Sequence, residues 1–142
     1  MQLTLVMLPA FEIFSTMAGV VFLTITTYGV LTENKSLLAL GICLFSIIPI
    51  AGEIYLYSLS SKPIHLIFLL IFLSQLIISL PTKSNPKVAF GLSKKASFAI
   101  LIINFSHGCL ILSVLFDVPL QFGFMHLILA LTMLYAVLKN NK

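Results

Sequence analysis

The chain has 142 residues and a net charge of +4; 60% of the residues are hydrophobic and only 8% are charged. A soluble domain carries about a quarter charged residues, so this composition excludes a domain whose whole surface faces water. It predicts an all-α integral membrane protein whose surface is solvated mainly by lipid. The cations are all lysines. Because proteins normally use arginine forks to bind phosphates and bases, we expect no nucleic-acid partner.

Five apolar runs follow one another along the sequence, each close to the roughly 20 residues that a transmembrane helix needs. They predict membrane spans at about 9–31, 37–59, 64–80, 96–116 and 122–138. Pro63 is suited to the first position of the third helix, and Pro81 closes that helix. We therefore expect a single domain, 1–142, folded as an antiparallel bundle of about five transmembrane helices with short loops.

The lysines are unequally divided between the two faces that this topology creates. The loop 32–36, the loop 81–95 and the C-terminus share one face and hold every lysine except Lys62. The positive-inside rule then places the N-terminus outside and the C-terminus on the cytoplasmic, or equivalent, side of the membrane. Anionic lipid headgroups attract lysines close to a span. We expect such contacts from the lysines of the longest polar loop: Lys83, Lys87, Lys94 and Lys95.

The second span carries a carboxylate, Glu53, in its outer half. A carboxylate at bilayer depth is costly, so it normally faces protein or water and has a partner. Pro49, one turn earlier, removes a backbone donor and predicts a kink. Helical spacing aligns four side chains of this span in one stripe that we expect to face the bundle interior: Ser46, Pro49, Glu53 and Tyr57.

Other spans offer polar faces that could meet this stripe. On the first span, Ser15 and Gly19 form a small-xxx-small pair, which predicts close packing against the second span. Glu12 lies near the start of the same span, where it either joins the polar site or complements the helix dipole. The fourth span carries Asn104 and His107 on one side. We expect a polar site, structural or able to bind protons or ions, built from Glu53, Glu12, His107, Asn104 and Tyr57.

The first functional hypothesis is a non-catalytic one. The loops provide almost no mass outside the membrane with which to hold a soluble substrate, and polar or small-residue helix faces suit helical partners. The chain is therefore predicted to be a small subunit or accessory protein of a larger membrane complex. Its partners would be lipid and other transmembrane subunits, or further copies of itself in a homo-oligomer.

Two alternatives remain open. Glu53 could serve a small proton- or ion-coupled transporter or channel, which with only five short helices would need an oligomer. A water-filled pocket at Glu53 that continues toward the lysine-rich face would distinguish this alternative. His107 and His126 could instead bind a cofactor or a metal ion. Enzymatic activity is the weakest hypothesis, because the sequence contains no Ser-His-Asp pattern, no HExxH, no glycine-rich phosphate loop and no CxxC pair.

Overall fold

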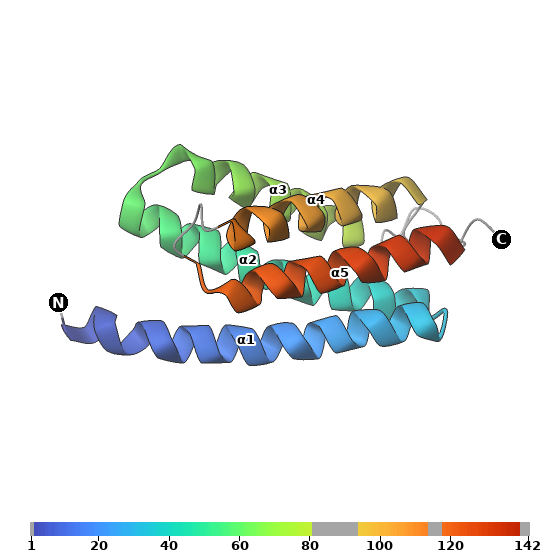
Figure 1. Cartoon of the computed structure of the whole chain (residues 1–142), viewed down its shortest axis with the longest axis horizontal. Helices are drawn as coiled ribbons and strands as arrows, with labels where there is room; N and C mark the ends of the chain where they lie inside the picture. The colour runs from blue at the N-terminus through green and yellow to red at the C-terminus, as the bar shows by residue number, and fades with distance from the viewer. Residues whose placement is uncertain (1, 81–93, 114–117, 140–142) are drawn as a thin grey trace.

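The computed structural model describes residues 2–80, 94–113 and 118–139. Over these residues it contains five helices and no strand: α1 (Gln2–Leu31), α2 (Lys35–Ser60), α3 (Pro63–Ser79), α4 (Lys94–Leu112) and α5 (Leu120–Lys139). Successive helices run in opposite directions along one long axis (Figure 1). The predicted antiparallel all-α bundle is confirmed.

Four of the helices, α1, α2, α4 and α5, are long and apolar enough to cross a bilayer. The apolar helix α3 has 17 residues. At 1.5 Å per residue it is about 25 Å long, slightly less than the roughly 30 Å of a hydrocarbon core. The composition and these lengths together identify an integral membrane helical bundle in which α3 is the shortest helix.

The predicted span limits agree with the helices to within a few residues, except at the end of the fourth span. The first predicted span, 9–31, coincides with the candidate membrane span Pro9–Leu31, and the helix α1 begins earlier, at Gln2, and continues through this proline. Apolar residues precede Pro9, and membrane helices tolerate an internal proline. Glu12 is consequently more than two turns inside α1, not in the first turn. The fourth span was expected to reach Phe116, whereas α4 ends at Leu112, and 114–117 lie outside the described residues.

Short turns hold neighbouring helices together at both ends of the bundle. Between α1 and α2, Glu33 adopts a left-handed conformation with φ 56°. Asn34 then caps α2 by accepting hydrogen bonds from the backbone N–H groups of Ser36 and Leu37, both at 3.1 Å. Pro63 begins α3, as predicted. We call the end that holds this second turn the α2–α3 end, and the opposite end, where Lys35 and Lys139 lie, the lysine-rich end.

The helices form a ring in which each contacts the next and α5 returns to α1. The α4–α5 pair packs extensively, whereas α3 approaches α4 over only a short stretch. Apolar side chains fill the centre of the ring: Leu23, Val30, Leu38, Ile42, Phe45, Ile100, Met125, Leu129, Met133 and Ala136. The thin α3–α4 junction matters for the functional site, because polar side chains cross it.

The predicted packing of α1 against α2 is present, and glycines allow it. A Cβ added at Gly19 would contact Ile48 of α2 and Met125 of α5. The closest backbone approaches lie further along α1. There Gly29 faces the backbone of Leu38, and Gly41 faces the backbone and hydroxyl of Thr26.

Gly41→Ala is expected to destabilise the protein, because the new methyl group overlaps the Thr26 backbone, which cannot rotate away. Overpacking of this kind costs about 1–3 kcal/mol. The matched control is Gly52→Ala in the same helix, where a Cβ meets nothing within 4 Å. Both changes gain the same helix propensity, so the difference between them reports the clash alone. Unfolding in detergent would be measured for both variants, and equal stabilities would contradict the close approach.

Candidate functional site

Glu53 lies on the buried face of α2 and is 5% exposed. Its Oε2 atom is 2.7 Å from Nδ1 of His65, which is also buried, in the first turn of α3. The tight turn after Ser60 brings the two helices together here. When Glu53 is ionised, its oxygen accepts this hydrogen bond and Nδ1 of His65 donates it. The buried carboxylate therefore has the partner that a charge at bilayer depth requires.

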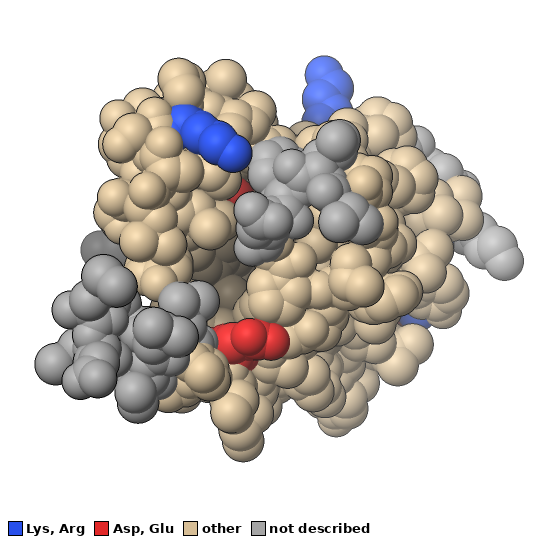
Figure 2. All heavy atoms as spheres, turned by 60° about the vertical axis from the view of Figure 1, so that its left-hand side comes forward, with Lys and Arg blue, Asp and Glu red and all other residues tan. Residues whose placement is uncertain are grey.

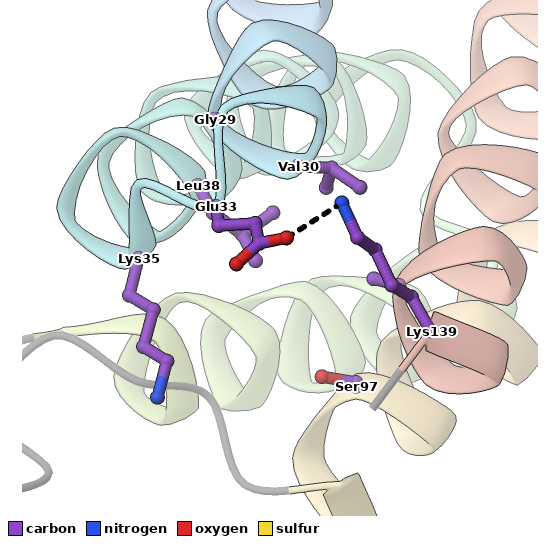
Figure 3. Close-up of a pocket in the computed structure, with 8 residues that line it drawn as sticks. Gly29, Val30, Glu33, Lys35, Leu38, Ser97 and Lys139 are labelled. Atoms are coloured by element: carbon purple, nitrogen blue, oxygen red, sulfur yellow. Dashed lines mark ion pairs between the residues drawn. The ribbon is translucent and has the colours of Figure 1, made fainter. Parts of the chain in front are cut away.

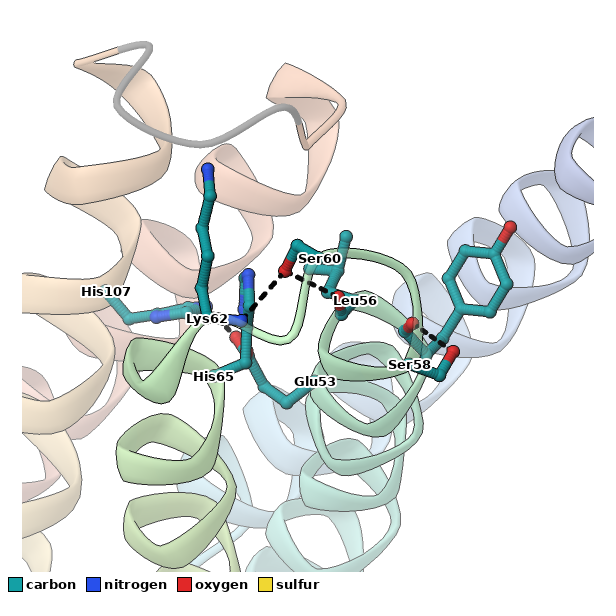
Figure 4. Close-up of polar contacts among 8 residues, drawn as sticks. Glu53, Leu56, Ser58, Ser60, Lys62, His65 and His107 are labelled. Carbon is teal, nitrogen blue, oxygen red and sulfur yellow. Dashed lines mark hydrogen bonds and ion pairs between the residues drawn. The ribbon is translucent and has the colours of Figure 1, made fainter.

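His107 approaches the same carboxylate from α4. Its Nε2 atom is 3.9 Å from Oε1 of Glu53, which is too long for a hydrogen bond but close enough for an ion pair when the imidazole is protonated. Figure 4 shows the ring pointing from α4 toward Glu53 and His65, whereas Lys62 points away. Phe68 and Phe72 of α3 pack edge-on against the His107 ring, with centroids 4.7 and 4.8 Å away. Nδ1 of His107 is buried and has no hydrogen-bond partner among the described residues.

His126 of α5 extends the cluster. Its ring meets that of His107 edge to face, with centroids 4.6 Å apart. Nδ1 of His126 lies 2.7 Å from Oδ1 of Asn104. The Asn104 amide nitrogen is used elsewhere, so Oδ1 accepts here and His126 is protonated at Nδ1. Nε2 of a neutral His126 therefore carries a lone pair. Glu53 and all three histidines of the chain belong to one buried group.

A chain of hydrogen bonds runs from His126 across the ring to α2. Asn104 donates to Oε1 of Gln75 at 2.8 Å and to the Ile100 carbonyl at 2.8 Å. Gln75 donates to the Ser46 hydroxyl at 2.9 Å, which donates to the Ile42 carbonyl at 2.8 Å. Each of these hydrogen bonds has one defined donor and one defined acceptor. The chain joins α5, α4, α3 and α2, and so crosses the thin α3–α4 junction.

A cavity of about 80 Å³ adjoins the cluster. Its polar lining is Glu53, His107 and His126, and its remaining walls are Phe45, Ile48, Pro49, Gly52, Leu56, Ile111, Val118, Phe122 and Met125. This volume holds about two or three water molecules. Gly52 borders open space, since a Cβ added there would meet nothing within 4 Å. Figure 2, which faces the α2–α3 end obliquely, shows the surface hollowed between the helices, with acidic atoms beside the hollow.

The cavity does not continue to the lysine-rich end among the described residues. A second cavity there shares no lining residue with the first. Along α2, α4 and α5, fully buried side chains lie between the two cavities: Ile42, Ile100, Asn104, Leu129 and Met133. We call these five residues the central plug.

The structure brings together some of the predicted site residues and separates others. Glu53, His107 and Asn104 meet in one cluster, which also includes His126. Glu12 lies elsewhere, where its Oε1 accepts a hydrogen bond of 2.6 Å from Gln121 of α5. Tyr57 is half-buried, and no contact between its hydroxyl and Glu53 is found in the described structure.

Two central residues were missed from the sequence. His65 was not among the predicted site residues, but it is buried against Glu53. The short turn between Glu53 and His65 could have indicated this contact. In a helical hairpin, residues at similar distances from the turn lie beside one another. Gln75 was overlooked, although an amide within a continuously apolar run needs a partner at bilayer depth.

The lysines expected at headgroups are described only in part. Lys83 and Lys87, and the side chain of Lys94, lie outside the described residues, and Lys95 is exposed at the start of α4. Over the described ranges, no group of three or more His, Cys, Asp or Glu residues is placed to hold a metal ion. The cavity beside His107 and His126 is far smaller than a haem or a chlorin. No protein-family model, curated protein or solved structure matches this chain.

Proposed function

We propose that the chain is a proton-coupled membrane carrier whose proton-binding site consists of Glu53, His65 and His107. The observation that carries the proposal is the convergence of Glu53 and all three histidines in one buried cluster beside a cavity. Carboxylates and histidines inside a membrane are costly and typically form proton relays. Histidine is the side chain whose unperturbed charge change falls between pH 5 and 8, which makes it a common proton carrier in proteins.

The geometry suggests how a proton would act on the fold. A proton entering from the α2–α3 end meets the cavity first and then Glu53 and His107. Protonation of His107 would turn its 3.9 Å approach to Glu53 into an ion pair between α4 and α2. Loss of that proton would remove the attraction. Because α3 and α4 touch over only a short stretch, such a change acts where the ring is weakest.

The central plug favours a carrier over an open channel. Ile42, Leu129 and Met133 are fully buried, and the two cavities share no lining residue among the described parts of the chain. The Gln75 and Asn104 amides hold their neighbours in position, but the lone pair of an amide nitrogen is delocalised into the carbonyl group, so the nitrogen does not accept a proton readily. A proton therefore crosses only if the helices rearrange, as in alternating access.

The test is proton flux into liposomes that contain the purified protein and a trapped pH dye. An external acid pulse is expected to acidify the interior faster than in protein-free liposomes. Gly52→Leu fills the cavity and leaves Glu53 itself unchanged. It is expected to lower the rate of acidification to nearly that of protein-free liposomes. Gly52→Ala adds one methyl group to the same open space and should preserve most of the flux. Wild-type flux equal to that of protein-free liposomes would refute the proposal.

The subunit role predicted from the sequence is a second proposal. That prediction was based on polar helix faces that need hydrogen-bond partners on other helices. Much of this hydrogen bonding occurs within the described part of the chain, through Glu53–His65 and Gln75–Asn104. Large apolar side chains remain exposed along α1 and α5, and either lipid or other subunits can cover them. Stoichiometric recovery with larger membrane proteins from the native membrane would support this role.

A further inference from the structure

A second cavity lies at the lysine-rich end, away from Glu53, and its volume is about 190 Å³. Residues from four helix ends and the α1–α2 turn line it: Gly29, Val30, Glu33, Lys35, Leu38, Ser97, Ala136 and Lys139. Because α1 and α5 end here and α2 and α4 begin here, this cavity lies at the depth of lipid headgroups. Figure 3 shows Lys35 and Lys139 on opposite sides of it.

The charged groups of this cavity favour an anion. Lys139 Nζ is 3.0 Å from Oε1 of Glu33. An ammonium group has three N–H donors, so Lys139 can keep this ion pair and still donate to a ligand. Lys35 supplies a second ammonium group. Ser97 is only 1% exposed, yet its hydroxyl points toward the cavity (Figure 3). The two lysines outnumber the one carboxylate, which Lys139 already neutralises.

An apolar groove adjoins the same place. Between α1 and α5 lies a cavity of about 260 Å³, lined by Thr27, Val30, Leu31, Leu131, Thr132 and Tyr135. Val30 lines both this groove and the polar cavity. Leu31 and Leu131 are exposed on the surface that faces lipid. A polar cavity at headgroup depth beside an apolar groove fits a molecule with an anionic head and a hydrocarbon tail.

We propose that this cavity binds the phosphate of an anionic phospholipid between Lys35, Lys139 and Ser97, with one acyl chain in the α1–α5 groove. The two ammonium groups and the Ser97 hydroxyl donate to the phosphate oxygens. The positive N-terminal end of α2 adds to the attraction. This site is independent of the proposed proton site, since the central plug separates them.

The test is a titration of the purified, delipidated protein with phosphatidylglycerol in a phosphate-free detergent, followed by native mass spectrometry. One lipid is expected to bind tightly per chain. The double variant Lys35→Gln/Lys139→Gln should weaken that binding by roughly 30-fold, from about a kilocalorie per lysine. Lys62→Gln at the opposite end is the control and should leave the affinity unchanged. Lys35 and Lys62 are exposed and Lys139 is partly buried, and circular dichroism would verify that the variants fold.

Three outcomes would overturn the proposal. If the double variant bound phosphatidylglycerol as tightly as the wild type, the lipid would not bind in this cavity. An equal loss in Lys62→Gln would mean that overall charge, not this cavity, attracts the lipid. Inorganic phosphate that displaces phosphatidylglycerol at equal concentration would show a site for free phosphate, in which the groove plays no part.

Discussion

Replacing Glu53 with glutamine is expected to abolish proton flux by the reconstituted protein and to leave the fold intact. Glutamine has nearly the same shape as glutamate and can keep a hydrogen bond to His65, which lies 2.7 Å from the carboxylate. It can neither ionise nor attract a protonated His107 across the 3.9 Å that separates them. The variant thus removes the charge that couples α2 to α4 and keeps the packing.

The dye assay in liposomes measures this effect, with Glu12→Gln as the matched control. Glu12 is also partly buried and also hydrogen-bonded, but its partner is Gln121, outside the cluster. Its amide variant should therefore transport protons at close to the wild-type rate. Glu53→Asp retains a carboxylate one methylene group shorter and should recover part of the flux. If Glu53→Gln transported protons as fast as the wild type, Glu53 would be a structural residue only.

Asn104→Ala is expected to cause the largest loss of stability among single substitutions in the cluster. The change strands two buried groups at once, the Nδ1–H of His126 and the amide oxygen of Gln75. An unsatisfied buried polar group costs about 1–3 kcal/mol, so we expect a loss of roughly 2–4 kcal/mol. The lower part of this range is favoured in a membrane, where the unfolded state also finds hydrogen-bond partners.

Unfolding in mixed micelles, followed by circular dichroism, measures this loss. Ser106→Ala is the control on the same helix, because Ser106 is exposed and its removal should change the stability very little. The double variant Asn104→Leu/Gln75→Leu removes both partners of one hydrogen bond. It should be less destabilising than the sum of the two single leucine variants. Strict additivity would mean that Asn104 and Gln75 do not act as a pair.

The polar cluster also explains which helix faces meet. Lipid tails are as apolar as leucine, so apolar faces alone do not select their neighbours within a membrane. Hydrogen bonds between Gln75, Asn104 and Ser46 exist in only one rotation of α2, α3 and α4. The cluster thus fixes the ring at its thin α3–α4 junction, and the same contacts hold the proposed proton site in place.

Helix number, helix direction and the burial of Glu53 followed from the sequence itself. Hydropathy and helix length are local properties, since each run must satisfy its own backbone hydrogen bonds in lipid. The polar stripe on α2 likewise needed only the 3.6-residue period, and Ser46, Pro49 and Glu53 are all buried. The helix-dipole alternative for Glu12 assumed a helix that begins near Pro9, whereas α1 begins at Gln2.

Partner choice was decided by the tertiary structure. The pairing of Glu53 with His65, of Asn104 with His126 and of Glu12 with Gln121 depends on the rotation and depth of each helix. Close approaches such as Gly41 against Thr26 set that rotation, and they join residues far apart in the chain. The cavities and the central plug arise in the same way. Side chains from two or more helices form each of them, so no single helix encodes them.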